Sequence, residues 1–210
     1  MVSHEHIDHV KGLGTLSKKH NIPVYANAKT WDAMPKQADK IAAGNKKFFV
    51  PNEAFEIGDI RIQPFSTPHD AANPCGFTMH HDNKKIGIAT DLGHVPSDLP
   101  TVLEGSDFVF LESNYEPEML QSSSYPYPLK QRIGGPNGHL SNEMAGELIS
   151  YLLTNGVKKF MLGHLSKENN FPELAYKTVV CEILRGPARG KNFSLDVAHR
   201  VFYNQIVRLR

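Results

Sequence analysis

Apolar residues recur at helical spacing in the second half of the chain, most clearly between Asn142 and Asn155. The apolar positions there fall on one face of a helix and are Met144, Leu148, Ile149 and Leu152. Gly156 follows at the position where helices commonly end. Weaker helical patterns cover residues 9–20, residues 30–43 with an interruption near Pro35, and residues 173–184. The sequence therefore predicts four helices.

Strands are predicted where apolar and polar residues alternate or where apolar residues form a short run. Residues 107–112 are largely apolar without alternation, which is typical of a central strand covered on both faces. Two hairpins are predicted, with turns at Gly58-Asp59 and at residues 82–84. The other strands are expected at residues 23–26, 157–162 and 201–207, and a loop at residues 122–128.

The order of these elements indicates the fold class. Hairpins occupy the first half of the chain, and strands alternate with helices in the second half. This order predicts an α/β fold with a mixed sheet. Because 210 residues suit one domain and no linker or internal repeat divides them, we expect a single domain over residues 1–210.

Composition narrows the class of protein without identifying it. A net charge of +1 and 40% hydrophobic residues are typical of a soluble globular protein and argue against a strongly basic nucleic-acid binder. The chain contains no apolar run of the roughly 20 residues that a membrane span needs, and no signal-peptide core. We therefore expect a cytoplasmic protein. Cys75 and Cys181 form no metal-binding pair, and Cys75 is interpreted as a packed apolar side chain.

The run from Ser3 to His9 is the most informative segment, because it holds three imidazoles and a carboxylate. Along an extended strand end, residues i and i+2 point the same way, so His4 and His6 can bind one metal ion together. Asp8 and His9 lie one step further and can reach a second ion. Nitrogen and oxygen ligands at this spacing suit Zn²⁺ or a similar metal.

Three later segments repeat one pattern, in which an apolar strand leads into a metal-binding side chain. These side chains are His69, Asp91 and His164. Strand ends in α/β folds gather ligands and catalytic groups, because the sheet fixes the backbone there. Together with the N-terminal run, they supply the missing ligands for two ions.

The ordered set His4-x-His6-x-Asp8-His9, His69, Asp91 and His164 resembles the metal-binding motifs of the metallo-β-lactamase superfamily of binuclear hydrolases. Residues 67–71, 90–93, 138–142 and 163–170 also resemble its YycJ/WalJ branch, which is assigned to nuclease-like phosphodiesterases. The resemblance implies an αββα sandwich with mixed sheets. Members normally have several strands before the first motif, so it also implies that these N-terminal strands are missing here. Met1-Val2-Ser3 would then be the tail of a central strand.

The resemblance further implies how two divalent ions are held. His4, His6 and His69 would bind one ion, Asp8, His9 and His164 the other, and Asp91 would bridge them. Zinc suits these ligands best, with manganese and iron as alternatives. Two ions about 3.5–4 Å apart can share a hydroxide and stabilise the attacking and leaving oxygens on phosphorus. Asp8 counts among the catalytic residues as well, because its charge offsets the repulsion between the cations.

Three further residues are candidates for supporting this chemistry. His139 is the candidate proton donor to the leaving group, since a histidine outside the ligand set usually has this role. Glu112 either orients His139 or is a structural carboxylate, and Asp70 either supports a ligand histidine or has no such role. Glu5 is interpreted as a surface or supporting carboxylate. Oxygen-reducing di-iron relatives place Glu where His6 stands, so electron transfer is not expected.

Substrate contacts are expected near the ends of two motifs. Ser141 and Asn142 would bind phosphate at a helix N-terminus, although Ser141 can equally be a plain N-cap. Ser166 and Lys167 follow the last ligand and are further candidates, with a solvated lysine as the alternative for Lys167. Tyr125 and Tyr127 could either stack on bases or pack within the protein. The basic residues of the C-terminal part could either contact the phosphate backbone or form an ordinary charged face; they are Arg185, Arg189, Lys191, Arg200, Arg208 and Arg210.

The leading hypothesis is a metal-dependent phosphodiesterase of the exonuclease kind that acts on single-stranded or end-exposed nucleic acid. One alternative is a small-molecule esterase or thioesterase, because the same metal pair can attack a carbonyl carbon. The other is a metal-binding interaction module without catalysis. The sequence leaves open the metal, DNA versus RNA, cleavage polarity, oligomeric state and partner proteins.

Overall fold

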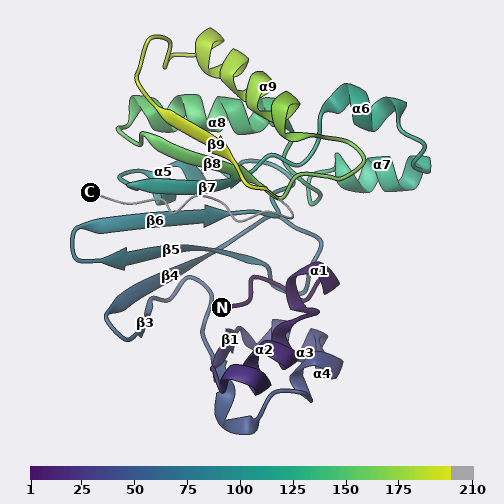
Figure 1. Ribbon diagram of the computed structural model, residues 1–210, viewed down its shortest axis with the longest axis vertical. Coiled ribbons are helices and arrows are strands. Elements are labelled where there is room, and N and C mark those ends of the chain that lie inside the picture. Colours follow the sequence, from purple (N-terminus) through teal and green to yellow (C-terminus); the bar gives the residue numbers. More distant parts are fainter. Residues whose placement is uncertain (200–210) are drawn as a thin grey trace. The chain divides into compact units, whose positions relative to one another are not determined.

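The computed structural model describes residues 1–199. The chain forms two compact units, shown together in Figure 1: unit 1 comprises residues 1–66 and 70–77, and unit 2 comprises residues 67–69 and those from 78 onward. The expectation of a single domain stays a prediction. The predicted strand 201–207 and the basic residues Arg200, Arg208 and Arg210 lie outside the described residues.

Unit 1 contains short helices around a small apolar core. The helices are α1 (Ile7–Val10), α2 (Leu13–His20), α3 (Ala28–Ala33), α4 (Pro35–Ala38) and the 3₁₀ helix η1 (Ala43–Asn45). The predicted helix 9–20 is therefore broken at Lys11-Gly12, and Asn21 ends it in a left-handed conformation with φ 48°. Pro35 begins α4, as expected of a residue that fits the first helical turn. Val10, Trp31 and Met34 are buried together in the core.

Two strand pairs complete unit 1. Strands β1 (Val24–Ala26) and β2 (Lys46–Phe48) are parallel, and β3 (Phe55–Ile57) and β4 (Ile60–Ser66) form the predicted antiparallel hairpin. Sequence reasoning missed β2, whose burial pattern is mostly exposed. The interpretation of Met1-Val2-Ser3 as a strand tail was wrong. This segment is coil, and the Val2 N–H donates to the Tyr25 carbonyl at 2.8 Å.

Unit 2 is built on parallel strands. Strand β5 (Cys75–His81) begins in unit 1 and ends in unit 2, and a two-residue turn connects it to β6 (Lys84–Ala89). Next come β7 (Phe108–Glu112), β8 (Lys159–Gly163) and β9 (Ser194–Val197), each parallel to its neighbour. The mixed pairing and the central position predicted for β7 are confirmed. The sequence analysis did not predict β9.

Helices follow the strands of unit 2. They are α5 (Leu99–Leu103), α6 (Pro117–Ser122), α7 (Tyr127–Ile133), α8 (Asn142–Thr154) and α9 (Pro172–Arg185). Helices α8 and α9 pack against each other along one face of strands β7 to β9 (Figure 1). The predicted loop 122–128 was partly wrong, because α6 and α7 enter it and leave only residues 123–126. Within residues 1–199, every helix is too short or too polar to cross a membrane.

One carboxylate joins the starts of β6 and β7. Asp107 accepts hydrogen bonds from the Lys85 backbone N–H at 2.9 Å and from Lys84 Nζ at 3.1 Å. The bond from Lys85, followed by that from Lys84, lowers the pKa of Asp107 below its ordinary value. A carboxyl whose pKa is lower in the folded state stabilises the fold above its unfolded pKa, and this stabilisation is lost as the pH falls through the folded pKa.

We expect Asp107→Asn to lower the free energy of unfolding at neutral pH by about 1 kcal/mol. Urea unfolding measures this loss, and the gap to the parent protein should shrink at about pH 3, below the unfolded carboxyl pKa of about 3.9. Asp98→Asn is the matched control, because Asp98 is exposed and its side chain does not cap α5. An equal loss at both pH values would contradict this account.

Candidate metal centre

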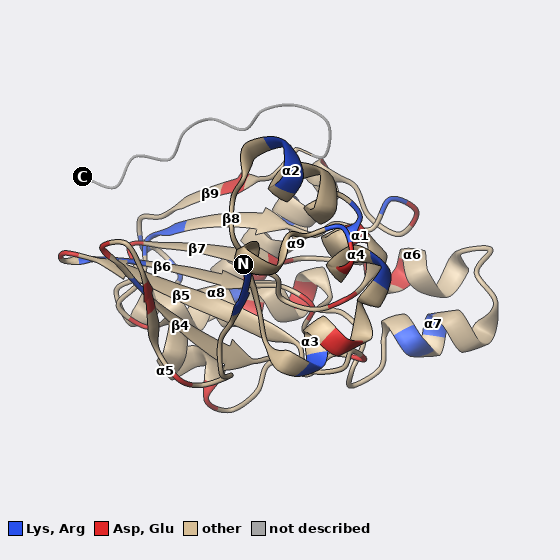
Figure 2. Ribbon diagram, turned by 90° about the horizontal axis from the view of Figure 1, so that it is seen from below, with Lys and Arg blue, Asp and Glu red and all other residues tan. Residues whose placement is uncertain are grey.

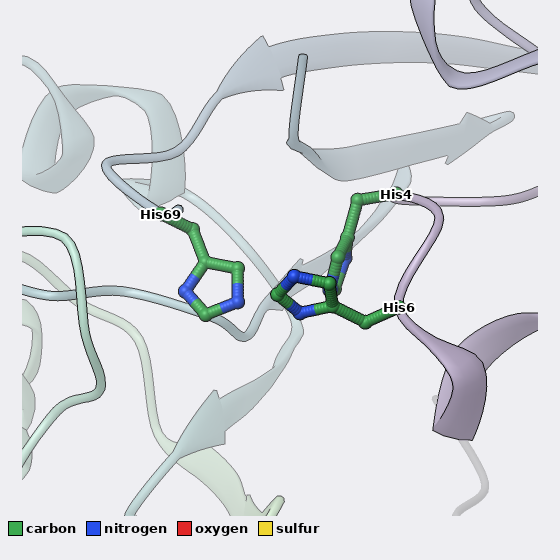
Figure 3. Close-up of side chains that lie close together, drawn as sticks. All are labelled: His4, His6 and His69. Atoms are coloured by element: carbon green, nitrogen blue, oxygen red, sulfur yellow. The ribbon is translucent and has the colours of Figure 1, made fainter. Parts of the chain in front are cut away.

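The N-terminal histidines of unit 1 form a cluster around Ser3. Ser3 Oγ lies 3.1 Å from both His4 Nδ1 and His9 Nδ1. The His4 ring is 4.5 Å from the His6 ring and 4.2 Å from the His9 ring, measured between centroids. Figure 3 shows His4 and His6 extending from the coil that precedes α1. The predicted pairing of His4 with His6 therefore occurs from coil rather than from a strand end.

The carboxylates near this cluster differ in their positions. Asp8 is exposed on α1, with Oδ2 3.6 Å from Nε2 of the adjacent His9. Asp70 Oδ1 lies 3.9 Å from His6 Nε2, which is an electrostatic contact and too long for a hydrogen bond. Glu5 Oε1 accepts a hydrogen bond from the Ala72 backbone N–H at 2.8 Å. Glu5 therefore fixes the loop that carries Asp70.

In unit 2, five side chains meet at the ends of strands or in the loops that follow them. We call His69, Asp91, Glu112, His139 and His164 the strand-end cluster; the His69 side chain is drawn in Figure 3. Asp91 is 2% exposed, and its Oδ1 lies 3.6 Å from Nε2 of both His69 and His164. His139 Nδ1 is 3.9 Å from the same oxygen. Three loops thus deliver histidines to one carboxylate oxygen.

Glu112 is the fully buried member of this cluster. Its Oε1 accepts from His139 Nδ1 at 2.8 Å and from His164 Nδ1 at 2.7 Å, while Oε2 accepts from the backbone N–H of Leu92 and Leu140. Burial by itself raises the pKa of Glu112, but the hydrogen bonds and charges of the two histidines outweigh it and lower the pKa to about 2. Glu112 is therefore a carboxylate, and it orients His164 as well as His139.

These contacts set which ring nitrogens face the cluster. A carbonyl or carboxylate oxygen only accepts, so Nδ1 carries the proton in His69, which donates to the Gly138 carbonyl at 2.8 Å, and in His164. The Gly138 backbone lies so close to the Ile133 carbonyl that a Cβ there would be 2.1 Å from its oxygen, and this position requires glycine. Nε2 of His69 and of His164 is therefore the ring nitrogen that faces Asp91.

This donor set fits a metal ion such as zinc. Two imidazole nitrogens and a carboxylate oxygen are zinc ligands, and ligands bound at about 2.0–2.2 Å in tetrahedral geometry lie roughly 3.4 Å apart. The distance of 3.6 Å from Asp91 Oδ1 to each Nε2 is close to that spacing. Held Nδ1 protons are also typical of metal-binding histidines. The strand-end cluster can therefore hold a divalent cation.

The predicted substrate residues are used in other ways. Ser141 is the N-cap of α8, where its Oγ accepts from the Met144 backbone N–H at 3.2 Å. Asn142 is fully buried, and its amide bonds to Glu116 and Asn170. The structure thus gives both side chains a role in building the start of α8, and their phosphate contacts stay a prediction.

The remaining substrate candidates lie at the surface or in loops. Ser166 Oγ accepts from the Asn169 backbone N–H at 3.1 Å, and Lys167 is exposed. Tyr127 is 71% exposed at the start of α7. Figure 2 shows basic residues on the same helix, which carries Lys130 and Arg132 in its last turn. Among the other predicted basic and aromatic residues, Arg185, Arg189 and Lys191 are exposed and Tyr125 is half-buried.

Two features of this site escaped the sequence analysis. Asp91 and His164 adopt left-handed backbone conformations, with φ of 61° and 56°, which residues with a Cβ rarely adopt. Such conformations concentrate at functional sites, where the surroundings hold them in place. Asn114, whose Nδ2 donates to the His164 carbonyl at 2.7 Å, was also missed. The signal for it was weak, because a single Asn after a strand has many ordinary roles.

Comparison with known proteins identifies relatives of this chain. The sequence model of the family described as "Beta-lactamase superfamily domain" matches residues 1–165. The chain is 40% identical over 179 residues to "Exodeoxyribonuclease YycJ" of Bacillus anthracis, covering 85% of this chain and 68% of the relative. It is 40% identical over 185 residues to "Exodeoxyribonuclease WalJ" of Streptococcus pneumoniae, covering 87% and 69%.

A solved structure supports the fold. The metallo-beta-lactamase fold protein YhfI from Bacillus subtilis is similar with a TM-score of 0.67 and 18% identity, covering 95% of this chain and 74% of that one. At this identity the likeness shows the fold alone. The α/β class and the metallo-β-lactamase-like fold expected from the sequence are confirmed, as is the resemblance to the YycJ/WalJ branch.

We expect Glu112→Gln to destabilise the metal-free protein by about 2–3 kcal/mol, because the introduced NH₂ group would face N–H donors in a buried site. Urea unfolding in the presence of a chelator measures this change. Glu118→Gln is the matched control on exposed α6 and should stay within about 0.5 kcal/mol of the parent. If Glu112→Gln is as stable as the parent, the buried carboxylate does not organise the cluster.

Proposed function

Because this chain belongs to the beta-lactamase superfamily, we propose that it is a metal-dependent phosphodiester hydrolase acting on DNA as an exonuclease. The observation that carries the proposal is the strand-end cluster, in which Asp91 Oδ1 lies 3.6 Å from Nε2 of both His69 and His164. Two relatives with 40% identity are named exodeoxyribonucleases, which supports nucleic acid as the substrate. We propose a single-stranded or end-exposed strand as the form attacked, and the cytoplasm as the compartment.

The ligand assignment rests on the order of the motifs and the donor types. We propose that His4, His6 and His69 bind one ion, that Asp8, His9 and His164 bind a second, and that Asp91 bridges the two. When bound, two divalent ions polarise the phosphodiester and make water a stronger nucleophile at neutral pH. Zinc suits this mixture of imidazole and carboxylate donors best. Asp8, which is exposed on α1, has room to turn toward an ion.

His139 is proposed as the proton donor to the leaving oxygen. Its side chain is 22% exposed, so substrate can reach it, while its Nδ1 is held by buried Glu112 at 2.8 Å. Because Nδ1 is engaged with Glu112, Nε2 is the ring nitrogen from which a proton would be transferred to the leaving oxygen. Glu112 thus gives His139 its orientation.

Substrate contacts are proposed at Ser141 and Asn142 and at three further residues. Ser141 and Asn142 also have partners within the fold, Ser141 as the N-cap of α8 and Asn142 in a buried amide network. Lys167, Ser166 and the exposed ring of Tyr127 are the proposed contacts to the strand.

We expect Asp91→Ala, or a chelator added to the parent protein, to lower DNA hydrolysis at least about 100-fold. Asp91 is the proposed bridge between two ions that act together on the phosphodiester. The assay follows product release from single strands labelled at the 5′ or the 3′ end. Asp98→Ala, on the exposed start of α5, is the control and should retain activity.

Parallel assays separate this proposal from its alternatives. Bis-p-nitrophenyl phosphate tests for a phosphodiesterase and a glutathione thioester tests for a thioesterase, each with Asp91→Ala as the blank. Turnover of the thioester alone would replace the proposal with a small-molecule hydrolase. Full metal occupancy without turnover of any ester would indicate a binding module. Undiminished DNA hydrolysis in chelator would end the metal-dependent account.

A further inference from the structure

A buried network of asparagine amides lies behind the strand-end cluster in unit 2. Asn142 and Asn170 exchange reciprocal hydrogen bonds through their amides at 3.1 and 2.9 Å. Asn142 Nδ2 also donates to Glu116 Oε2 at 2.8 Å, and the same oxygen accepts from Thr178 Oγ1 of α9 at 3.0 Å. Buried amides of this kind rigidify their surroundings when their groups are paired. The network ties the start of α8 to α9.

The network extends to the peptide that follows β7. Asn170 Nδ2 donates to the carbonyls of Ser113 and Asn114 at 2.9 and 3.0 Å. The Asn114 backbone N–H donates to the Leu140 carbonyl at 2.8 Å, and the Asn114 carbonyl accepts from Ser166 N–H at 2.7 Å. The backbone of Asn114 is thereby held by three residues from two separate segments, and its side chain starts from a fixed position.

The Asn114 side chain is hydrogen-bonded to the backbone of His164. Its Nδ2 donates to the His164 backbone carbonyl at 2.7 Å, and a carbonyl can face only the nitrogen end of an amide. His164 has φ of 56°, a left-handed conformation that is unfavourable for a residue with a Cβ unless its surroundings hold it. Glu112 holds the ring of His164, and Asn114 holds its backbone.

Gly163, which precedes His164, shows why the His164 backbone needs the hydrogen bond from Asn114. Gly163 packs against Phe110 so closely that a Cβ would lie 2.0 Å from the ring. The chain leaves β8 past this ring and turns at once into the left-handed conformation of His164. A small rotation of the 163–164 peptide would move the imidazole, because the ring is attached directly to the turning residue.

We propose that Asn114 is a positioning residue for metal binding, which acts by holding the His164 backbone so that Nε2 of His164 stays directed at Asp91. This inference rests on the proposed function, because it assigns His164 as a metal ligand. Asn114 touches neither the metal nor the substrate in this account. The simpler alternative is that Asn114 only stabilises the fold.

Metal affinity of the purified full chain distinguishes these roles. We expect Asn114→Ala to weaken Zn²⁺ binding by about 10-fold or more, as is typical for residues that orient a ligand histidine, and to change the visible spectrum of the Co²⁺-loaded protein. Competition against a chelator of known affinity measures the binding. Urea unfolding of the metal-free form measures the structural contribution separately.

Asn155→Ala is the matched control. Asn155 Nδ2 also donates to a backbone carbonyl, that of Tyr151 at 3.0 Å, but at the exposed end of α8. The Asn155→Ala variant should have the same metal affinity and Co²⁺ spectrum as the parent protein. If Asn114→Ala does not fold, Asn114→Ser, which keeps a hydroxyl donor, is measured in the same way and should show a smaller loss in the same direction.

A double substitution completes the test. In a His164→Ala background, Asn114→Ala should weaken the remaining metal binding no further, since the residue through which it acts is gone. Equal weakening in both backgrounds, or unchanged affinity and spectrum in Asn114→Ala, would overturn the inference. Loss of DNA hydrolysis is not used as a readout, so a parent protein that binds metal without cleaving DNA would refute the proposed function alone.

Discussion

The strand-end cluster depends on one buried carboxylate, that of Glu112. It accepts hydrogen bonds from two histidine rings and two backbone N–H groups, contributed by three separate segments. A charge this deep is tolerated only because donors surround it, and the same donors keep it ionised. The Glu112 position therefore determines where Asp91, His139 and His164 lie.

Parallel strand order explains why these residues meet. Strands β6, β7 and β8 are neighbours with the same direction, so Asp91, Glu112 and His164 follow at the same edge of the sheet. The left-handed conformations of Asp91 and His164 then turn the chain sharply at this edge. Their cost is offset by the hydrogen bonds of Glu112 and Asn114, which a random loop would not supply.

Much of this arrangement could be predicted from the sequence. Strong periodicity located α8, and continuous apolar residues identified β7 as central, because burial on both faces leaves a clear pattern. His69, Asp91 and His164, three of the proposed metal ligands, were recognisable because each follows a strand. Strand β9 and helices α6 and α7 were missed or misplaced, since short elements with few buried residues have weak patterns.

The roles of polar residues were harder to predict. Ser141 precedes α8 and Asn142 begins it, a position that suggests phosphate binding and capping equally. The structure adds a capping role for Ser141 and a place for Asn142 in the buried network around Asn170. Glu112 could be assigned one histidine partner from its position at a strand end, but not two, because the second comes from 52 residues away. Long-range pairing of this kind depends on the fold and has no local signature.

The central claim is that Asp91 and His164 coordinate a metal ion. Anomalous scattering from crystals grown with zinc, collected on both sides of the zinc absorption edge, tests it most directly. The account predicts a zinc peak at bonding distance, about 2.0–2.2 Å, from Asp91 Oδ1 and His164 Nε2. Zinc bound only elsewhere, with no peak within bonding distance of either side chain, would contradict it.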